Sequence, residues 1–197
     1  MNVRKPIIAG LMSLTTLAPC KAQKPVEFIA ETGISGFIKK DANFYTGMNF
    51  GIPKGKNYTD LYAGISVQPD KKASFVGLAI NDYAWNKNIS SWGRGTFVAS
   101  DRAANATWEL APVRVNKSVK KFNFSFSPSY ALYNDFKAGT TTQGLSFIPQ
   151  ITYSPTKRNT FFLEMKYSTE PAKNLFKTHF GSPKDNMFYM FSYMTKF

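Results

Sequence analysis

Residues 187–197 read MFYMFSYMTKF, and the alternation in this stretch predicts the fold. Phe191, Tyr193 and Phe197 share one face with the other odd-numbered residues, whereas Ser192 and Lys196 lie on the opposite face. A period of two is that of a β-strand. An apolar strand left at a free sheet edge would recruit other chains, and only a closed barrel has no edge. The stretch therefore predicts the closing strand of a membrane barrel, with odd-numbered side chains in lipid and even-numbered ones in the lumen.

The same alternation recurs along the chain between clusters of Gly, Pro, Asn, Asp and Lys. The clearest ribbons are residues 122–132, 144–154, 161–168 and 187–197, and weaker ones are residues 26–35, 44–52, 61–68, 76–81 and 108–115. The span 92–100 is the ambiguous one, since counting it gives ten strands and omitting it gives nine. Bacterial single-chain barrels use even strand numbers. We therefore predict an all-β, antiparallel, up-and-down transmembrane β-barrel of ten strands, with eight as the alternative.

In every ribbon the apolar face is expected to contact lipid, and on this rule Val76, Leu78 and Ile80 point outward. Pro112, Pro128 and Pro149 fall inside predicted strands, where each removes a ladder hydrogen bond that lipid cannot replace. Each proline therefore predicts a bulge or a position near the membrane rim. A soluble β-sandwich with one buried face is the alternative fold. The barrel is favoured because one face of nearly every strand is rich in aromatic and aliphatic residues.

The lengths of the connections predict the topology, because outer-membrane barrels have short periplasmic turns and longer outer loops. Counting back from the end of the chain, residues 169–185 form a long outer loop and residues 155–159 a short inner turn. Residues 134–141 are then an outer loop and residues 116–119 an inner turn. In the N-terminal half, residues 39–42 and 69–73 would be short outer loops.

The N-terminal residues are typical of a secretory signal peptide. Arg4 and Lys5 precede an apolar stretch at residues 7–18, and small residues near Ala22 fit a cleavage site. We expect residues 1–22 to be removed and residues 23–197 to form one barrel domain. Pro19 makes acylation of Cys20 a poor fit. The mature chain would then contain no cysteine, which excludes disulfides and thiol catalysis.

The signal peptide, the alternating ribbons and the terminal sequence from Tyr193 to Phe197 together resemble the small outer-membrane β-barrel proteins of Gram-negative bacteria. The resemblance covers the mature chain at the level of the class. It implies a location in the outer membrane and insertion by the barrel-assembly machinery with periplasmic chaperones. In that class the terminal aromatic, here Phe197, is part of the assembly signal, and Tyr193 and Phe191 would extend it.

Without residues 1–22, 22 lysines and arginines oppose 12 acidic residues, which is a net charge of +10. A basic surface attracts anions such as nucleic acid, anionic polysaccharide or glycolipid phosphates. The lysines cluster at predicted connections, which suits side chains that reach the membrane interface better than a nucleic-acid stripe. We therefore expect outer-membrane lipid and lipopolysaccharide as partners and no nucleic acid. Lys173, Lys177 and Lys184 on the longest loop are the expected anion contacts.

Strand parity also predicts a polar cluster inside the barrel. The residues expected to point inward are Glu27, Glu31, Glu109, Arg114, Glu164 and Lys166. Desolvating a lone ion is costly, so these charges are expected to form pairs or hydrogen-bonded groups. Because the interior of so small a barrel is narrow, the cluster could act as a structural plug.

Three functions follow from these patterns. The leading one is a structural or surface-interaction barrel whose basic loops contact lipopolysaccharide or an external ligand. The alternative is a narrow channel for small solutes or hydrophobic ligands. A soluble periplasmic β-sandwich that binds ligands is third. No enzyme, cofactor or metal site is expected, since His179 is the only histidine and lies with Ser182 and Asp185 in a Gly- and Pro-containing loop.

Overall fold

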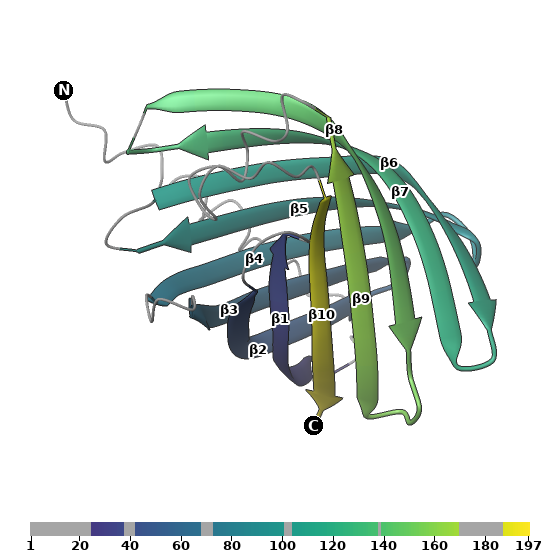
Figure 1. Cartoon of the computed structure of the whole chain (residues 1–197). Helices are drawn as coiled ribbons and strands as arrows, with labels where there is room; N and C mark the ends of the chain where they lie inside the picture. The colour runs from purple at the N-terminus through teal and green to yellow at the C-terminus, as the bar shows by residue number, and fades with distance from the viewer. Residues whose placement is uncertain (1–24, 38–41, 68–72, 101–103, 138, 170–186) are drawn as a thin grey trace.

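The computed structural model describes residues 25–37, 42–67, 73–100, 104–137, 139–169 and 187–197. Ten antiparallel strands form one closed barrel, in which each strand pairs with the next and the first pairs with the last (Figure 1). The strands are β1 Glu27–Phe37, β2 Asn43–Lys54, β3 Asn57–Val67, β4 Ala73–Ala84, β5 Ile89–Ala99, β6 Ala104–Val119, β7 Phe122–Asp135, β8 Thr140–Tyr153, β9 Asn159–Ser168 and β10 Met187–Lys196. The prediction of a ten-stranded barrel is confirmed. No helix in the described ranges is long and apolar enough to cross a membrane.

The C-terminal strand closes the barrel as its sequence predicts. β10 pairs with β1 over a continuous register, which includes Thr32↔Tyr193 and Ile34↔Phe191. Phe197 extends this ladder beyond the strand, since its N–H donates to the carbonyl of Phe28 at 3.0 Å. On the other side β10 pairs with β9 without a shift of register. The last strand therefore has hydrogen-bond partners on both sides.

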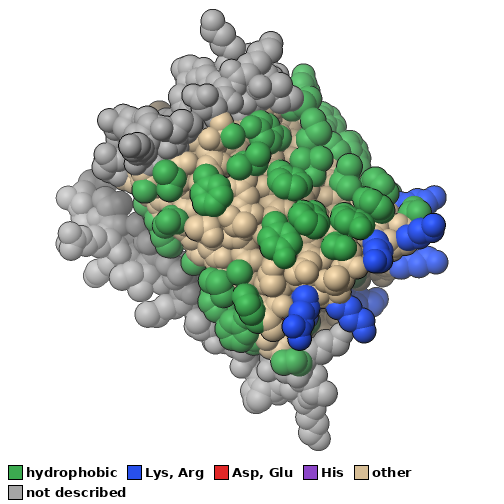
Figure 2. Space-filling view, turned by 60° about the horizontal axis from the view of Figure 1, so that its bottom comes forward, with side chains coloured by type: hydrophobic (Ala, Val, Ile, Leu, Met, Phe, Trp, Pro, Cys, Tyr) green, Lys and Arg blue, Asp and Glu red, His purple; other side chains and the backbone are tan. Residues whose placement is uncertain are grey.

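The outer wall of the barrel is apolar. Exposed aliphatic and aromatic side chains project from every strand, among them Phe44, Ile65, Trp108, Leu110, Phe126, Leu145 and Phe191. The space-filling view shows such side chains spread over the described outer wall (Figure 2). Near the ends of the strands that lead into the short turns, rings contact one another from β7 to β10, for example Phe122 with Tyr153 at 4.6 Å and Phe161 with Tyr193 at 5.1 Å between centroids. Such an aromatic girdle is typical of a membrane interface.

Short turns connect the strands at one end of the barrel. They are residues 55–56, 85–88, 120–121 and 154–158. Gly55 and Lys120 each have a positive φ, of 60° and 54°, which the first position of a tight hairpin turn requires. The predicted turn at 116–119 was therefore wrong by a few residues, because β6 continues to Val119. In outer-membrane barrels the short turns lie on the periplasmic side.

The three prolines coincide with irregularities in the ladder. Between Leu110 and Val115 the pairing of β6 with β7 shifts register, so Pro112 lies in a bulge of β6 and Pro128 lies opposite it on β7. The bulge leaves Val113 and Val115 on the outer face with Leu110. At Pro149 the pairing of β8 with β9 skips two residues and resumes in the same register. The prediction of a bulge or rim position holds for Pro112 but not for Pro149, where a local gap is sufficient.

The outward placement of Val76, Leu78 and Ile80 is corrected by the structure. These β4 residues line the lumen, while Phe75 and Tyr83 on the opposite face are exposed. The physical reason is Asp82, which shares their face and pairs with Arg114 inside the barrel. If β4 faced the other way, the Asp82 carboxylate would lie in lipid. This would cost more free energy than exposing three aliphatic side chains to the lumen.

We expect the two faces of β4 to respond differently to a charge. Ala79→Arg places a guanidinium on the lipid face near mid-strand and should lower the free energy of unfolding by about 2–4 kcal/mol. Leu78→Arg, one residue earlier and facing the lumen, should cost much less. Urea unfolding in lipid vesicles, followed by the heat-dependent shift in gel mobility, measures both. A larger loss for Leu78→Arg would mean that β4 is shifted by one residue.

Candidate functional site: the barrel lumen

In one half of the lumen, side chains from neighbouring strands extend over the inner face of β7. Four successive inward residues of β7 are small, namely Ser125, Ser127, Ser129 and Ala131. Larger side chains from β5, β6, β8 and β9 therefore extend over this wall without clashing. The Trp92 indole of β5 reaches across β6 and donates to Ser127 Oγ at 3.1 Å. Trp92, Ala111 and Ile148 form a small buried apolar group, which is called the Trp92 group below.

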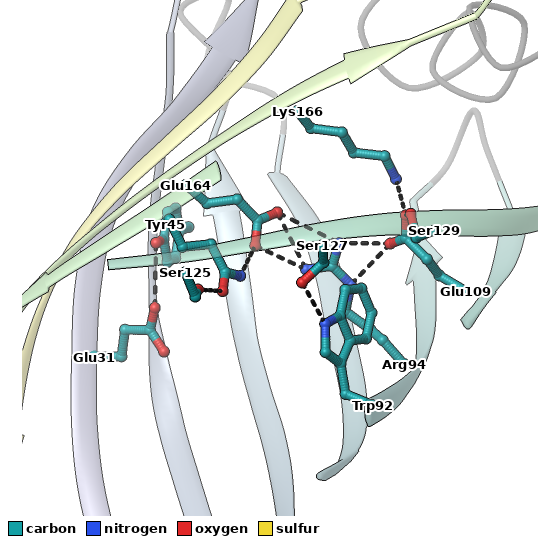
Figure 3. Close-up of polar contacts among 11 residues, drawn as sticks. Glu31, Tyr45, Trp92, Arg94, Glu109, Ser125, Ser127, Ser129, Glu164 and Lys166 are labelled. Carbon is teal, nitrogen blue, oxygen red and sulfur yellow. Dashed lines mark hydrogen bonds and ion pairs between the residues drawn. The ribbon is translucent and has the colours of Figure 1, made fainter. Parts of the chain in front are cut away.

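An ion-pair network lies on the same half and connects β5 and β6 with β9 (Figure 3). Arg94 of β5 donates to Glu109 Oε2 at 2.6 Å and to Glu164 Oε1 at 3.2 Å. Lys166 donates to Glu109 Oε1 at 2.6 Å, so two cations and two carboxylates alternate. The side chains of Glu109 and Glu164 are only 2% exposed. This group, Arg94, Glu109, Glu164 and Lys166, is called the charge network below.

Neutral donors complete the hydrogen bonding of the charge network. Ser129 donates to Glu109 at 2.8 Å, and Gln150 donates to Glu164 at 2.8 Å. Ser125 in turn lies 2.8 Å from the Gln150 amide oxygen. The Arg94 guanidinium also lies over the Trp92 ring at 5.2 Å from its centroid. Because every charge has an opposite charge and further donors or acceptors, the network is stable only as a unit.

The opposite half of the lumen, formed by β1 to β4 and β10, is built differently. Three tyrosines lie against the wall over glycines. A Cβ added to Gly64 would meet Tyr62 Oη at 2.2 Å, and one added to Gly33 would meet Tyr45 Oη at 2.7 Å. A Cβ on Gly51 would meet Tyr58 Oη at 2.0 Å. The glycines let the rings lie along the wall, and this half of the lumen is called the open half below.

Four carboxylates line this open half: Glu27, Glu31, Asp60 and Asp82. Two of them have cations, since Glu27 pairs with Lys196 and Asp82 pairs with Arg114 at 2.5 Å. Glu31 receives hydrogen bonds from Asn49 at 2.6 Å and Tyr45 at 3.2 Å, which are neutral donors. Asp60 Oδ1 and Tyr62 Oη are buried and have no hydrogen-bond partner in the described part of the chain.

A cavity of about 450 Å³ lies in the lumen and is lined by described residues of both halves, the charge network among them. This volume is far above the roughly 10–15 Å³ that one water molecule needs on the same measure. Its walls include Ser35, Asn43 and Ser74 near the loop end of the barrel, and Asn123 and Thr152 near the short-turn end. Apolar side chains also line it: Val76, Leu78 and Ile80 from β4, Phe162 from β9, and Phe188, Met190 and Met194 from β10.

In the described ranges, acidic residues face the lumen, whereas exposed basic residues gather at the short-turn end. All acidic residues of the described ranges lie on inward faces: Glu27, Glu31, Asp60, Asp82, Glu109, Asp135 and Glu164. These seven acids meet four inward bases, Arg94, Arg114, Lys166 and Lys196, so the formal charge of the described lumen is −3. The short-turn end instead carries exposed bases only, Lys54, Lys56, Lys87, Lys117, Lys120, Lys121, Lys157 and Arg158, and Figure 2 shows lysines and arginines gathered at one end.

Most residues predicted to form the site are where parity placed them. Glu27, Glu31, Glu109, Arg114, Glu164 and Lys166 all face the lumen, but their contacts divide them into four groups rather than one cluster. Phe191 is exposed on the outer face, and Tyr193 donates to Asn159 at 3.1 Å. Lys173, Lys177 and Lys184 lie outside the described residues, as do His179, Ser182 and Asp185. Their proposed roles stay predictions.

Several important lumen residues are not among those predicted from the sequence. Arg94 and Trp92 lie in the ambiguous span, where Ser90, Trp92, Arg94, Thr96 and Val98 do alternate inward. That alternation, with one charge among neutral residues, was the available signal. Ile148 is the one apolar residue on the polar face of the ribbon 144–154, and its packing with Trp92 explains its presence there. Asp60 and Tyr62 carried no comparable signal.

The apolar outer wall, the aromatic girdle, the closed ladder and the polar interior define the class: the chain is an integral outer-membrane β-barrel protein. No protein-family model and no curated protein sequence matches it. Among solved structures it is similar to the KdgM porin in complex with disordered oligogalacturonate, at 7% identity over 87% of this chain and 98% of the porin, with a TM-score of 0.44. The NanC porin gives 10% identity over 88% and 100%, with a TM-score of 0.44. A loop L8 deletion mutant of OmpT, an outer membrane protein of Vibrio cholerae, gives 10% over 88% and 60%, with a TM-score of 0.39.

We expect removal of Arg94 to be strongly destabilising. Arg94→Met leaves Glu109 with one cation and Glu164 with none, and breaking a buried pair in this way costs about 3–5 kcal/mol. The matched control is Arg114→Met, whose pair with Asp82 is more exposed and should cost less. Urea unfolding of the folded barrel in vesicles compares the two. Equal losses would contradict a special role for the charge network.

The glycine positions give a separate prediction. In Gly64→Ala the new methyl would meet both the Tyr62 ring and the backbone carbonyl of Thr46, so the ring and the neighbouring strand must shift, at a cost of about 1–3 kcal/mol. Gly77→Ala is the control, because its nearest neighbour, Phe75, lies at an ordinary 3.5 Å. Unfolding measurements should separate the variants. An unchanged stability in Gly64→Ala would mean that Tyr62 does not lie over Gly64.

Proposed function

We propose that the protein is a narrow passive channel that prefers small cations. The observation that carries this proposal is the cavity, whose walls include residues near both ends of the barrel. The cavity supports the alternative function predicted from the sequence, which is a channel for small solutes or hydrophobic ligands. The role is passive diffusion, without catalysis or a cofactor.

The filled half of the lumen limits what could pass. The charge network and the Trp92 group occupy the side formed by β5 to β9, so solutes would move along the side formed by β1 to β4 and β10. A ten-stranded barrel is only slightly wider than an eight-stranded one, whose interior side chains can fill completely. Small solutes therefore fit this path, and large ones do not.

The charge of the open side supports a preference for cations. The charge network is neutral as a whole, and the pairs Glu27–Lys196 and Asp82–Arg114 are also neutral. Glu31 and Asp60 remain without a paired cation in the described ranges. A narrow pathway with low-dielectric walls concentrates the field of such charges, which favours entry of the opposite sign. The lumen therefore differs in sign from the basic chain as a whole.

Planar-bilayer recording tests the proposal. In a KCl gradient the reversal potential should show K⁺ favoured over Cl⁻, and the double variant Glu31→Gln with Asp60→Asn should weaken that preference. A unit charge about 4 Å from a permeating ion changes its energy by about 1 kcal/mol even in water, which is about fivefold in occupancy. Gln and Asn preserve shape, so the effect would report charge.

A charge-neutral control makes the test specific. Asp82→Asn combined with Arg114→Gln removes an ion pair of the same half without changing the net charge. Selectivity should stay as in the wild type. Folded protein that shows no current, or current indifferent to Glu31 and Asp60, would remove the proposed mechanism.

A further inference from the structure

The open half of the lumen contains polar atoms whose hydrogen-bonding capacity is unused. Tyr62 is only 8% exposed, lines the cavity, and its hydroxyl has no hydrogen-bond partner among the described residues. Asp60 Oδ1, two residues earlier on β3, is likewise buried and unpartnered within the described ranges. Buried polar groups are almost always satisfied in native structures, so two such atoms on one inward face indicate a missing partner.

An apolar surface lies directly beside these atoms. In the β3–β4 ladder Asp60 is the partner of Ile80, and Tyr62 is the partner of Leu78. Direct partners point to the same face of a sheet, so both aliphatic side chains line the cavity next to the carboxylate and the phenol. Val76 continues the stripe one step further, opposite Gly64. Methionines and phenylalanines of β9 and β10 line the other flank of the same cavity.

The glycines beneath Tyr62 determine which part of its ring is available. Added Cβ atoms on Gly47 and Gly64 would both meet Tyr62 Cζ at 2.6 Å, so the ring lies against the wall over them. Tyr62 also lines the cavity, so the side of the ring away from these glycines borders it. A tyrosine face attracts cations, and quaternary ammonium groups in particular are bound by such rings beside acidic groups.

The chemistry of these walls selects the class of ligand. An anion would meet Asp60 and Glu31 without a paired base. A bare metal ion would find too few oxygens, because Ca²⁺ takes six to eight and no metal-holding group of acids and histidines exists in the described ranges. A hydrated inorganic cation would gain nothing from Val76, Leu78 and Ile80. Only a cation with an apolar part uses both surfaces.

We infer that the channel contains a binding site for an organic cation, whose ammonium group contacts Asp60 and Tyr62 and whose apolar part lies on the β4 stripe. Glu31, held by Asn49 and Tyr45 on the neighbouring wall, adds a second negative charge to the site. This inference deepens the proposed channel function by naming a substrate class. Amines with an aromatic or aliphatic substituent are that class.

Calorimetric titration of the folded barrel in detergent tests the site with three small ions. Phenyltrimethylammonium carries both features, tetramethylammonium carries only the charge, and benzenesulfonate carries the ring with the opposite charge. We expect phenyltrimethylammonium to bind at least about tenfold more tightly than tetramethylammonium, because its ring buries apolar surface. Benzenesulfonate should not bind. Equal affinity for the first two ions, or binding of benzenesulfonate, would overturn the inference.

Two variants assign the interactions. Asp60→Asn should weaken both cations about tenfold or more, whereas Leu78→Asn should weaken phenyltrimethylammonium and leave tetramethylammonium nearly unchanged. Lys87→Gln, which removes an exposed charge from the turn at residues 85–88, is the control and should change neither. The heat-dependent gel shift verifies that each variant is folded. Unchanged affinity in folded Asp60→Asn would disprove the site.

The titration and the current recording test the binding site and the channel separately. The titration needs no current, so a barrel that binds phenyltrimethylammonium but does not conduct would retain the site and lose the channel. In a conducting barrel, block of the K⁺ current by phenyltrimethylammonium should follow the order of the calorimetric affinities in wild type and variants. Conduction without binding would retain the channel and remove the site.

Discussion

The requirement that every backbone hydrogen bond be made inside the protein governs this structure. Lipid offers no donor or acceptor, so a sheet that crosses the membrane must close on itself. The pairing of β1 with β10 meets that requirement, and the N–H of Phe197 continues it to the last residue. The three prolines, which cannot donate, lie where the ladder is already interrupted by the β6 bulge or by the gap between β8 and β9.

Closure creates a narrow interior, and the two halves of the lumen fill it differently. The charged side chains that extend over the small residues of β7 are buried. A buried charge is costly unless it is paired, and these residues pair with one another in the charge network. On the other half, glycines receive the tyrosine rings, and the resulting space holds acids that are only partly paired. The same fold thereby combines a rigid support with an accessible surface.

The sorting of charge gives the barrel two chemically distinct surfaces. Acids are confined to the lumen in the described ranges, while bases gather at the short turns, where their side chains reach the level of lipid phosphates. The net charge of the whole chain, +13, is opposite in sign to the charge of the described lumen and says little about the pathway. The net charge alone would predict anionic partners, whereas the walls of the cavity favour cations.

The sequence by itself determined the strand number, the strand order and, for nearly every strand, which residues face inward. It could do so because a period of two, combined with a lipid exterior, allows only one side of each strand to be apolar. β4 was the exception, since its aliphatic residues share a face with Asp82, and the ion pair with Arg114 decided the outcome. The tertiary structure alone decided which inward residues meet. Arg94 contacts Glu164 although three strands, β6 to β8, lie between β5 and β9 in the ring, because barrel closure brings their inner faces together and no local pattern encodes that distance. For the same reason the unpartnered Asp60 and Tyr62 beside the β4 stripe could be recognised only after the register of β3 with β4 was known.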